Sequence, residues 1–526
     1  MKSKLLLFLM MLVGGMACAQ SVIVGGQQDG VWEADTVRVV SNVKVIDSLR
    51  VAPGTVVLFD GFYSISVQDG AIFKAQGTET DSIRFTMADT TGFYMYDTQK
   101  GAWNGFQVYK AGQVLFDYCV LEYGKAADTT DPKGGAIRIE HCDDVEISHS
   151  TLRCNRAREH GGAISAEDAR VVMTDCRVND NVVFTKDNLF YMYGGALRFL
   201  RCDVEMRGME FRRNDGASCV GGAISLDSCS VVLDRAVFTD NVGINGGGLY
   251  LMRSNHLKCR LSNLLFDNNL SGHFGGGLAF CDVSPDVYNI LVTNNESEGV
   301  SCSGIFFFQY CAPRMTNCIV YGNYPGSTAG NPDTVQMWLW TFEDYAPEFR
   351  NCLIEGGTKY IRGDELIKVF DDIIEDDPLF VDAERHDFRL SLNSPCRDAG
   401  FREVPEYLAE GLDLAGNRRV LNEIIDIGPY EYASASLPQC SSDSYGAQLV
   451  GNPLTAKSRI EFDQDLKGDV NVVVYSLTGC RASQKTFGWV QSRQLDLGDL
   501  VERLTPGVYL IEVEVNGKFH VLKAVK

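Results

Sequence analysis

The acidic residues Glu140 and Glu167 are the side chains whose spacing suggests catalysis most directly. Each lies five residues after the second glycine of a Gly-Gly pair. If the two glycine pairs begin successive stacked turns of the chain, the two carboxyl groups lie side by side, about 5 Å apart. Carboxyl groups at that separation can hydrolyse a glycoside with retention or hold a calcium ion. Glu140 and Glu167 are therefore candidate catalytic residues.

Charged residues at equivalent positions flank this acidic pair. Arg138, Arg198 and Asp227 each follow a glycine pair by three or five residues, so they should point outward on the same face. They are candidate binding residues. An exposed face with scattered charges would produce the same pattern. We favour this second interpretation, because the charges along the face are sparse and an enzyme would need a dense set.

Two tryptophans form a second candidate site. Trp338 and Trp340 alternate on one strand within the irregular stretch 324–346, which places both rings on one side. They could form a platform on which sugar rings stack, but packing in the core or against a terminal segment is the interpretation we favour. The sequence contains no Cys-x-x-Cys pair, phosphate-binding loop or nucleophile elbow. We therefore expect no zinc and no organic cofactor, and calcium is the one ion left open.

A repeat of about 27 residues must position these side chains. Its first signal, Gly-Gly followed by a small and an aliphatic residue, begins at positions 134, 161, 194, 221, 246 and 275. Its second signal is an apolar residue three positions before an asparagine, at Asn155, Asn181, Asn214, Asn241, Asn269, Asn295 and Asn323. One repeat cannot bury a face alone, so the repeats must stack. Glycine suits turns where backbone crowds backbone. Asparagine tolerates a left-handed turn and can hydrogen-bond along the stack, so we predict structural roles for both.

The same register explains many of the 17 cysteines. One column, which also holds alanine, leucine and methionine, is predicted to be buried and apolar; its cysteines are Cys119, Cys176, Cys318 and Cys352. In a second column, Cys202 and Cys229 lie on neighbouring turns, close enough for a disulfide. We favour free thiols for most of them.

The Gly-Gly-Ala-Ile and Phe-x-x-Asn motifs resemble the repeats of chlamydial polymorphic outer-membrane proteins and of bacterial right-handed β-helix repeat proteins. The resemblance covers roughly residues 114–323. It implies a right-handed parallel β-helix, and members of the first family are surface adhesins. The predicted fold class is all-β, with a right-handed parallel β-helix followed by a small C-terminal β-sandwich.

Composition divides the chain into five parts. Residues 1–19 have the features of a signal peptide, with a short apolar run and the cleavage pattern Ala17-Cys18-Ala19; a lipid-bearing Cys18 is the alternative. We assign 20–375 to the β-helix, 376–433 to a terminal cap segment, 434–447 to a linker and 448–526 to the β-sandwich. The cap segment should cover the open sheet edge of the last turn. Its acids Asp398, Asp413 and Asp426 should serve turns and salt bridges.

Residues 448–526 closely resemble the C-terminal sorting domain of the type IX secretion system of Bacteroidetes. The matching motifs are Asn452-Pro453, 475–479, 506–510 and the basic ending 523–526, and Cys480 departs from the family pattern of glycine followed by Arg or Lys. The residues assigned to sorting are Asn452, Pro453, Gly479, Gly507, Tyr509, Lys523 and Lys526. The resemblance implies that the outer-membrane translocon recognises this domain, which is often cleaved when the cargo is attached to the cell surface.

The net charge of −21 argues against nucleic acid as a partner, because binding its phosphates needs a basic surface. We expect export through the periplasm to the cell surface or the medium, with no transmembrane segment in the mature chain. The expected partners are the type IX machinery and a polysaccharide or host surface glycan. Two functions stay open: an adhesin or glycan-binding scaffold, which we favour, and a polysaccharide lyase or glycoside hydrolase.

Overall fold

The computed structural model describes residues 21–96, 98–127, 132–184, 192–299, 302–325, 336–420, 424–432, 447–476, 481–502, 504–515 and 518–526. The chain forms two compact units, which divide between Tyr432 and Ala433. Strands make up most of both units. No helix in the described ranges is long and apolar enough to cross a membrane.

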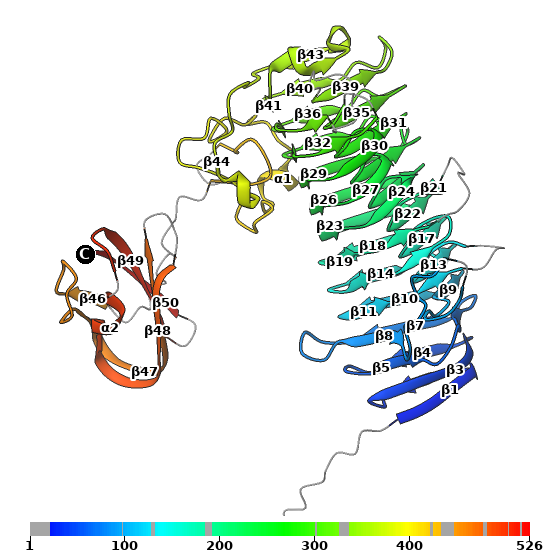
Figure 1. Ribbon diagram of the computed structural model, residues 1–526, viewed down its shortest axis with the longest axis horizontal. Helices are drawn as coiled ribbons and strands as arrows, with labels where there is room; N and C mark the ends of the chain where they lie inside the picture. The colour runs from blue at the N-terminus through cyan, green and yellow to red at the C-terminus, as the bar shows by residue number, and fades with distance from the viewer. Residues whose placement is uncertain are drawn as a thin grey trace, which may run out of the picture. The chain divides into compact units, whose positions relative to one another are not determined.

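The first unit is a right-handed parallel β-helix (Figure 1). Each coil adds one strand to each of three parallel ladders before the chain climbs to the next coil. The first ladder contains β3 (Thr36–Val45), β6 (Ile65–Val67), β9 (Phe106–Tyr109), β13 (Ile137–Glu140), β17 (Ile164–Glu167), β22 (Leu197–Leu200), β25 (Ile224–Asp227), β28 (Leu249–Met252), β31 (Leu278–Cys281), β35 (Ile305–Phe308), β39 (Met337–Trp340) and β42 (Ile361–Arg362).

The other two ladders run beside it. The second contains β2 (Gly30–Trp32), β4 (Ser48–Val51), β7 (Ile72–Gln76), β10 (Gln113–Asp117), β14 (Val145–Ser148), β18 (Arg170–Thr174), β23 (Asp203–Arg212), β26 (Ser230–Thr239), β29 (Cys259–Asp267), β32 (Asp286–Tyr288), β36 (Arg314–Thr316), β40 (Glu348–Arg350) and β43 (Val369–Asp371). The third contains β1 (Ser21–Gln27), β5 (Val56–Phe59), β8 (Ile83–Met87), β11 (Cys119–Glu122), β15 (Thr151–Arg153), β19 (Arg177–Asn179), β33 (Leu291–Thr293), β37 (Ile319–Val320) and β41 (Leu353–Ile354), together with parts of β3, β23, β26 and β29.

A short ladder follows the third one in most coils. It contains β12 (Lys125–Ala126), β16 (Arg156–Ala157), β20 (Val182–Val183), β24 (Asp215–Val220), β27 (Val242–Asn245), β30 (Leu270–Phe274), β34 (Glu296–Ser297) and β38 (Tyr324–Pro325), with β21 (Met192–Tyr193) beside β24. Inward side chains of all coils form one continuous core. For example, Ile137 and Ile139 are fully buried and lie opposite Ile164 and Ala166 of the next coil.

The asparagine column stabilises the stack as predicted, but only one of its two proposed reasons is right. From Asn181 to Asn323, the Oδ1 atom of each asparagine accepts hydrogen bonds from the backbone N and the Nδ2 of the preceding asparagine, at 2.9 to 3.1 Å. The left-handed conformation, however, belongs to the residue before each asparagine, such as Cys154, Asp180 and Asn294. The asparagines therefore satisfy buried backbone donors beside the corner.

The glycine pairs have the predicted role. Gly161 has a φ of +60°, and a Cβ on Gly162 would lie 2.4 Å from the carbonyl oxygen of Gly195 on the next coil. The first glycine of the pair supplies the left-handed turn, and the second allows backbone to approach backbone.

The cysteine columns are also buried as predicted. Cys119, Cys176, Cys318 and Cys352 are all about 1% exposed. Every cysteine in the described residues is a free thiol. Cys202 and Cys229 are adjacent, with the backbone N of Cys202 donating to Sγ of Cys229 at 3.4 Å.

The terminal segment after β43 lies against the side of the β-helix, whereas the sequence suggested a cap over the last coil. It contains β44 (Phe380–Asp382), η3 (Ala383–Arg385), β45 (Asp387–Leu390) and α1 (Glu406–Ala409), after η1 (Gly357–Tyr360) and η2 (Asp364–Leu366) of the last coils. Its apolar residues, such as Phe388 and Ile427, pack on outward side chains of the third ladder: Leu265, Leu291, Ile319 and Leu353. These three leucines and one isoleucine would otherwise be exposed to water, and burying them favours this position of the terminal segment.

The second unit is all-β, as predicted. Its strands β46 (Ala447–Val450), β47 (Arg459–Ser476), β48 (Arg481–Asp496), β49 (Val508–Val515) and β50 (Lys518–Val525) form one antiparallel sheet, with α2 (Gly498–Val501) at its edge. The long strand β47 curves strongly (Figure 1). Residues from both its halves, Ile460 and Val472 among them, share one core, so the sheet folds over itself as a sandwich does.

Candidate functional site

The predicted acidic pair lies on the outer face of the first ladder. Glu140 of β13 is in register with Glu167 of β17, so the two carboxylates occupy one column on neighbouring coils. Both are partly exposed. Arg138, on the same strand as Glu140, donates from Nε to its Oε1 at 3.0 Å. Glu140 is thus bound to an arginine of its own strand.

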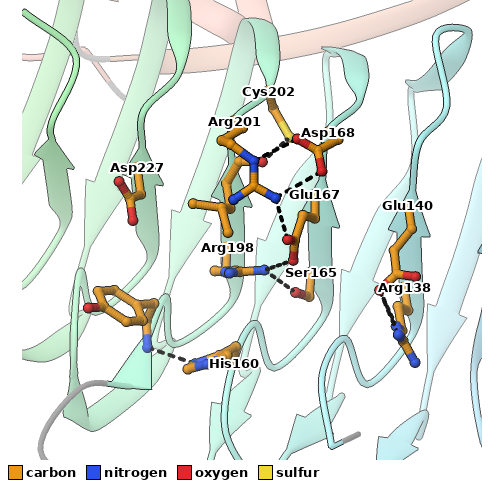
Figure 2. A network of polar contacts seen from close by, with 12 residues as sticks. Arg138, Glu140, His160, Ser165, Glu167, Asp168, Arg198, Arg201, Cys202 and Asp227 are labelled. Atoms are coloured by element: carbon orange, nitrogen blue, oxygen red, sulfur yellow. Dashed lines mark hydrogen bonds and ion pairs between the residues drawn. The ribbon is translucent and has the colours of Figure 1, made fainter.

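Glu167 is held by two arginines (Figure 2). Arg198 Nη1 donates to its Oε2 at 3.4 Å, and Arg201 Nη2 donates to its Oε1 at 2.5 Å. Arg201 also binds Asp168 at 2.7 and 2.8 Å. Partial burial works to raise the pKa of Glu167, but the two arginines outweigh burial and lower it. At neutral pH Glu167 is therefore ionised, whereas retaining hydrolysis needs one carboxyl group that can donate a proton.

Asp227 and His160 are also in structural contacts. Asp227 is 6% exposed and accepts a hydrogen bond from Arg253 Nε at 2.7 Å. His160 accepts one from the backbone N of Tyr193 at 3.2 Å (Figure 2). Burial and then the charge of Arg198 lower the pKa of His160 to about 3, so its ring is a neutral acceptor at physiological pH.

The outer face is more covered than the repeat pattern suggested. The first outward column was expected to be exposed, but Ser165, Arg198, Ser225, Ala279 and Phe306 are each less than 9% exposed. The short ladder provides part of the cover, since the ring of Phe274 stacks on that of Phe306 with 4.5 Å between the ring centres. The described residues contain no group of three or more acids, histidines or cysteines arranged to hold a metal ion.

A pocket opens on this face a few coils beyond the acidic pair. It has a volume of about 380 Å³ and is lined by Met192, Tyr193, Ser218, Val220, Ile244, Asn245, Tyr250, Met252 and His273. Its walls are largely apolar and its polar groups are few, which is the usual composition of a small-ligand site. Tyr250 and Met252 belong to the two outward columns of the first ladder.

Beyond the pocket, the outer face carries aromatic side chains. We call Phe274, Phe306, Phe308, Trp338 and Trp340 the aromatic strip. Trp338 and Trp340 are in register with Phe306 and Phe308, so the stretch predicted to be irregular contains the next regular coil. The rings of Phe306 and Trp338 are 5.6 Å apart, and those of Phe308 and Trp340 are 5.5 Å apart.

The two tryptophans differ in exposure. Trp338 is half-buried between its neighbours, with the guanidinium of Arg362 4.0 Å from its ring centre. Trp340 is 53% exposed, and Tyr310 and Phe342, two residues after Phe308 and Trp340, are 44% and 52% exposed. Phe306 and Phe308 were not predicted to be neighbours of the tryptophans. The signal was present in the alternation shared by 305–308 and 337–340.

Most of the predicted sorting residues gather at one end of the second unit. Asn452 Oδ1 accepts the backbone N–H of Val525 at 2.8 Å, and the Asn452–Pro453 peptide is cis. Gly507 and Lys526 exchange backbone hydrogen bonds, and Tyr509 donates to the carbonyl of Thr505 at 2.8 Å. Lys523 pairs with Leu510 on the neighbouring strand. Gly479 lies outside the described residues.

The stacked coils and their outer face place the first unit in the class of right-handed parallel β-helices, a fold shared by polysaccharide-active enzymes and surface proteins. Residues 70–263 match the family model of the right-handed β-helix region. Among solved structures, the A-module of a mannuronan C-5 epimerase from Azotobacter vinelandii is similar at 16% identity and a TM-score of 0.28, covering 64% of this chain and 86% of that one. No curated protein sequence gives a significant match.

Proposed function

We propose that this protein is displayed on the cell surface and binds a glycan on the outer face of its β-helix without cleaving it. The observation that carries the proposal is the aromatic strip, which ends in the exposed ring of Trp340. The apolar face of a sugar ring packs on aromatic rings, and a β-helix holds such rings on a rigid sheet. The polar groups of the neighbouring pocket could orient the bound glycan chain.

An enzyme acting at Glu140 and Glu167 is the second candidate. The column that these residues share supports it, since neighbouring strands bring the two carboxylates close together. The arginines bound to both acids count against it. A lowered pKa at Glu167 keeps this residue from donating the proton, which leaves that role to Glu140, a carboxylate bound by Arg138.

Replacing Trp340 by alanine tests the binding proposal. We expect affinity for the preferred polysaccharide on a glycan array to fall about tenfold, because an aromatic contact contributes roughly 1 kcal/mol or more. The matched control is Tyr324→Ala, which removes a ring that is 56% exposed but is not one of the five rings of the strip. Equal binding by wild type and Trp340→Ala would rule out the strip as the site.

We also propose that the second unit is a type IX sorting domain. The motifs at 452–453, 506–510 and 523–526 support this assignment, as does the position of their residues at one end of one small sheet. Its expected role is to be recognised by the secretion machinery, either before or during attachment to the surface.

Deleting residues 448–526 tests this assignment. We expect the truncated protein to accumulate in the periplasm, measured by fractionation and by surface labelling of intact cells. The control is Asp499→Ala, which changes an exposed side chain of the same unit and should leave export normal. Normal surface display of the truncated protein would contradict the assignment.

A further inference from the structure

A groove runs along the flank of the β-helix, on the third ladder. The outward residues of this ladder change from polar to apolar along the stack: Thr151, Arg177 and Glu210 are followed by Val237, Leu265 and Leu291. The terminal segment covers the apolar part. The polar outward residues are not covered in this way, and the groove begins where the terminal segment ends its contact with the ladder.

Two adjoining cavities make up this groove. The first has a volume of about 660 Å³ and the second about 470 Å³, and both are lined by Glu210 and Val237. The corner residues along the first are Tyr118, His149, Asp175, Gly208 and Arg235, which lie on five successive coils. At the strand spacing of about 4.8 Å the groove is therefore about 20 Å long, which suits an extended polymer.

One end of the groove holds a fixed histidine. His386 of the terminal segment lines it, and its Nδ1 lies 2.7 Å from Oδ2 of Asp267. Asp267 is 2% exposed and also accepts a hydrogen bond from Asn294 at 2.9 Å. The side chain of His386 keeps more than half of its surface exposed. A polar group held in place by a buried partner loses little entropy when a ligand binds.

The charges in the groove favour a neutral ligand. Five acids line it, Glu79, Asp175, Glu210, Asp240 and Asp267, against three arginines, Arg177, Arg212 and Arg235. All three arginines already lie 3.3 to 3.4 Å from acids, so an anionic polymer would meet excess negative charge. Hydroxyl groups both donate and accept, and so they can bind arginines and carboxylates alike.

An aromatic stack adds a contact surface for sugar rings. Tyr118 and His149 stack with their ring centres 4.5 Å apart, at the opposite end of the groove from His386. We infer that this groove is a second binding site, separate from the aromatic strip, for an extended, uncharged polysaccharide chain.

The test uses the full exported protein in affinity electrophoresis through gels that contain dextran, xylan, mannan or amylose, with alginate as the anionic comparison. The groove variant is Tyr118→Asn combined with His149→Asn. Asparagine occupies the equivalent corner in later coils, at Asn263, Asn289, Asn317 and Asn351, with the same left-handed backbone. The variant should therefore fold, and an unchanged melting temperature verifies this.

We expect at least one neutral polymer to retard the wild-type protein, and the groove variant to bind that polymer about tenfold more weakly. A second variant, Glu210→Ala, should weaken binding in the same gels without removing a ring. Equal retardation of wild type and both variants would overturn the inference. So would alginate binding that is stronger than binding to every neutral polymer, or the absence of retardation by all four.

Trp340→Ala, run in the same gels, distinguishes this site from the aromatic strip. If only Trp340→Ala loses binding, the groove inference fails and the proposed function stands. If the groove variants lose binding while Trp340→Ala does not, the groove inference stands and the strip is not the site.

Discussion

Single arginines determine what chemistry is left to the acids around them. Arg201 binds both Glu167 and Asp168, which leaves two ionised, neutralised carboxylates on the outer face. Arg419 in the terminal segment is fully buried, with its Nε 3.2 Å from Glu431. Asp413 and Asp426 lie near it and accept backbone N–H groups of Glu431 and Tyr432. Asp413 and Asp426 thus serve turns, as predicted, whereas the ion pair of Arg419 is with Glu431.

The excess of buried acids around Arg419 makes the stability of the terminal segment depend on pH. Burial, which Arg419 only partly offsets, raises the pKa of Glu431 to about 8. The folded protein therefore keeps this proton between pH 4.5 and 8, while the unfolded chain loses it. Stability contributed by Glu431 is full below pH 4.5 and is lost as pH rises towards 8.

The variant Glu431→Gln tests this dependence, because its amide carries no titrating proton. We expect the melting temperature of the wild type to fall between pH 5 and 8, and that of the variant to fall less. Burial also raises the pKa of Asp426, and this residue accounts for the pH dependence of the melting temperature that is left in the variant. Calorimetry across this range makes the comparison, and parallel curves for the two proteins would disprove the role of Glu431.

Among the elements, the asparagine column contributes most clearly to the regular stacking of coils. Asn214 accepts two hydrogen bonds from Asn181 and donates to Val178 and Asn241. All of these groups are buried, so they cannot form hydrogen bonds with water when the side chain of Asn214 is removed.

Asn214→Ala should therefore destabilise the β-helix by about 3 kcal/mol, since unpaired buried groups cost about 1–3 kcal/mol each. The measurement is the urea midpoint followed by intrinsic fluorescence. Asp203→Ala is the control, because Asp203 is exposed on the same unit. A shift no larger than the control's would mean that the column contributes little.

Much of this element-level structure could be predicted from the sequence, because a short repeat determines which side chains point inward. The asparagines, glycine pairs and cysteine columns all follow from that local pattern. The cover over the outer face could not be predicted, since it depends on how far the short ladder extends from Phe274 and its equivalents. The position of the terminal segment was also missed. It depends on an apolar cluster that joins residues distant in sequence, such as Leu353 and Ile427.

At the scale of the whole molecule, the β-helix presents two surfaces of different character. The outer face offers an aromatic strip and an apolar pocket, and the flank offers a long polar groove. The acidic pair lies on the first of these surfaces, but its register alone did not reveal that Arg198, Arg201 and Arg138 bind it. Ion pairs of this kind depend on side-chain rotamers and on the residues at the corners, such as Arg201. The repeat pattern specifies neither of these.

Whether the β-helix binds a glycan without cleaving it is tested most directly by following a bound polysaccharide over time. The wild-type protein and Glu167→Gln are each mixed with the glycan that binds most strongly. The length of the glycan chains and the number of new chain ends are then measured. We expect both proteins to bind the glycan and neither to change its chain length. Cleavage by the wild type that disappears in Glu167→Gln would contradict this expectation.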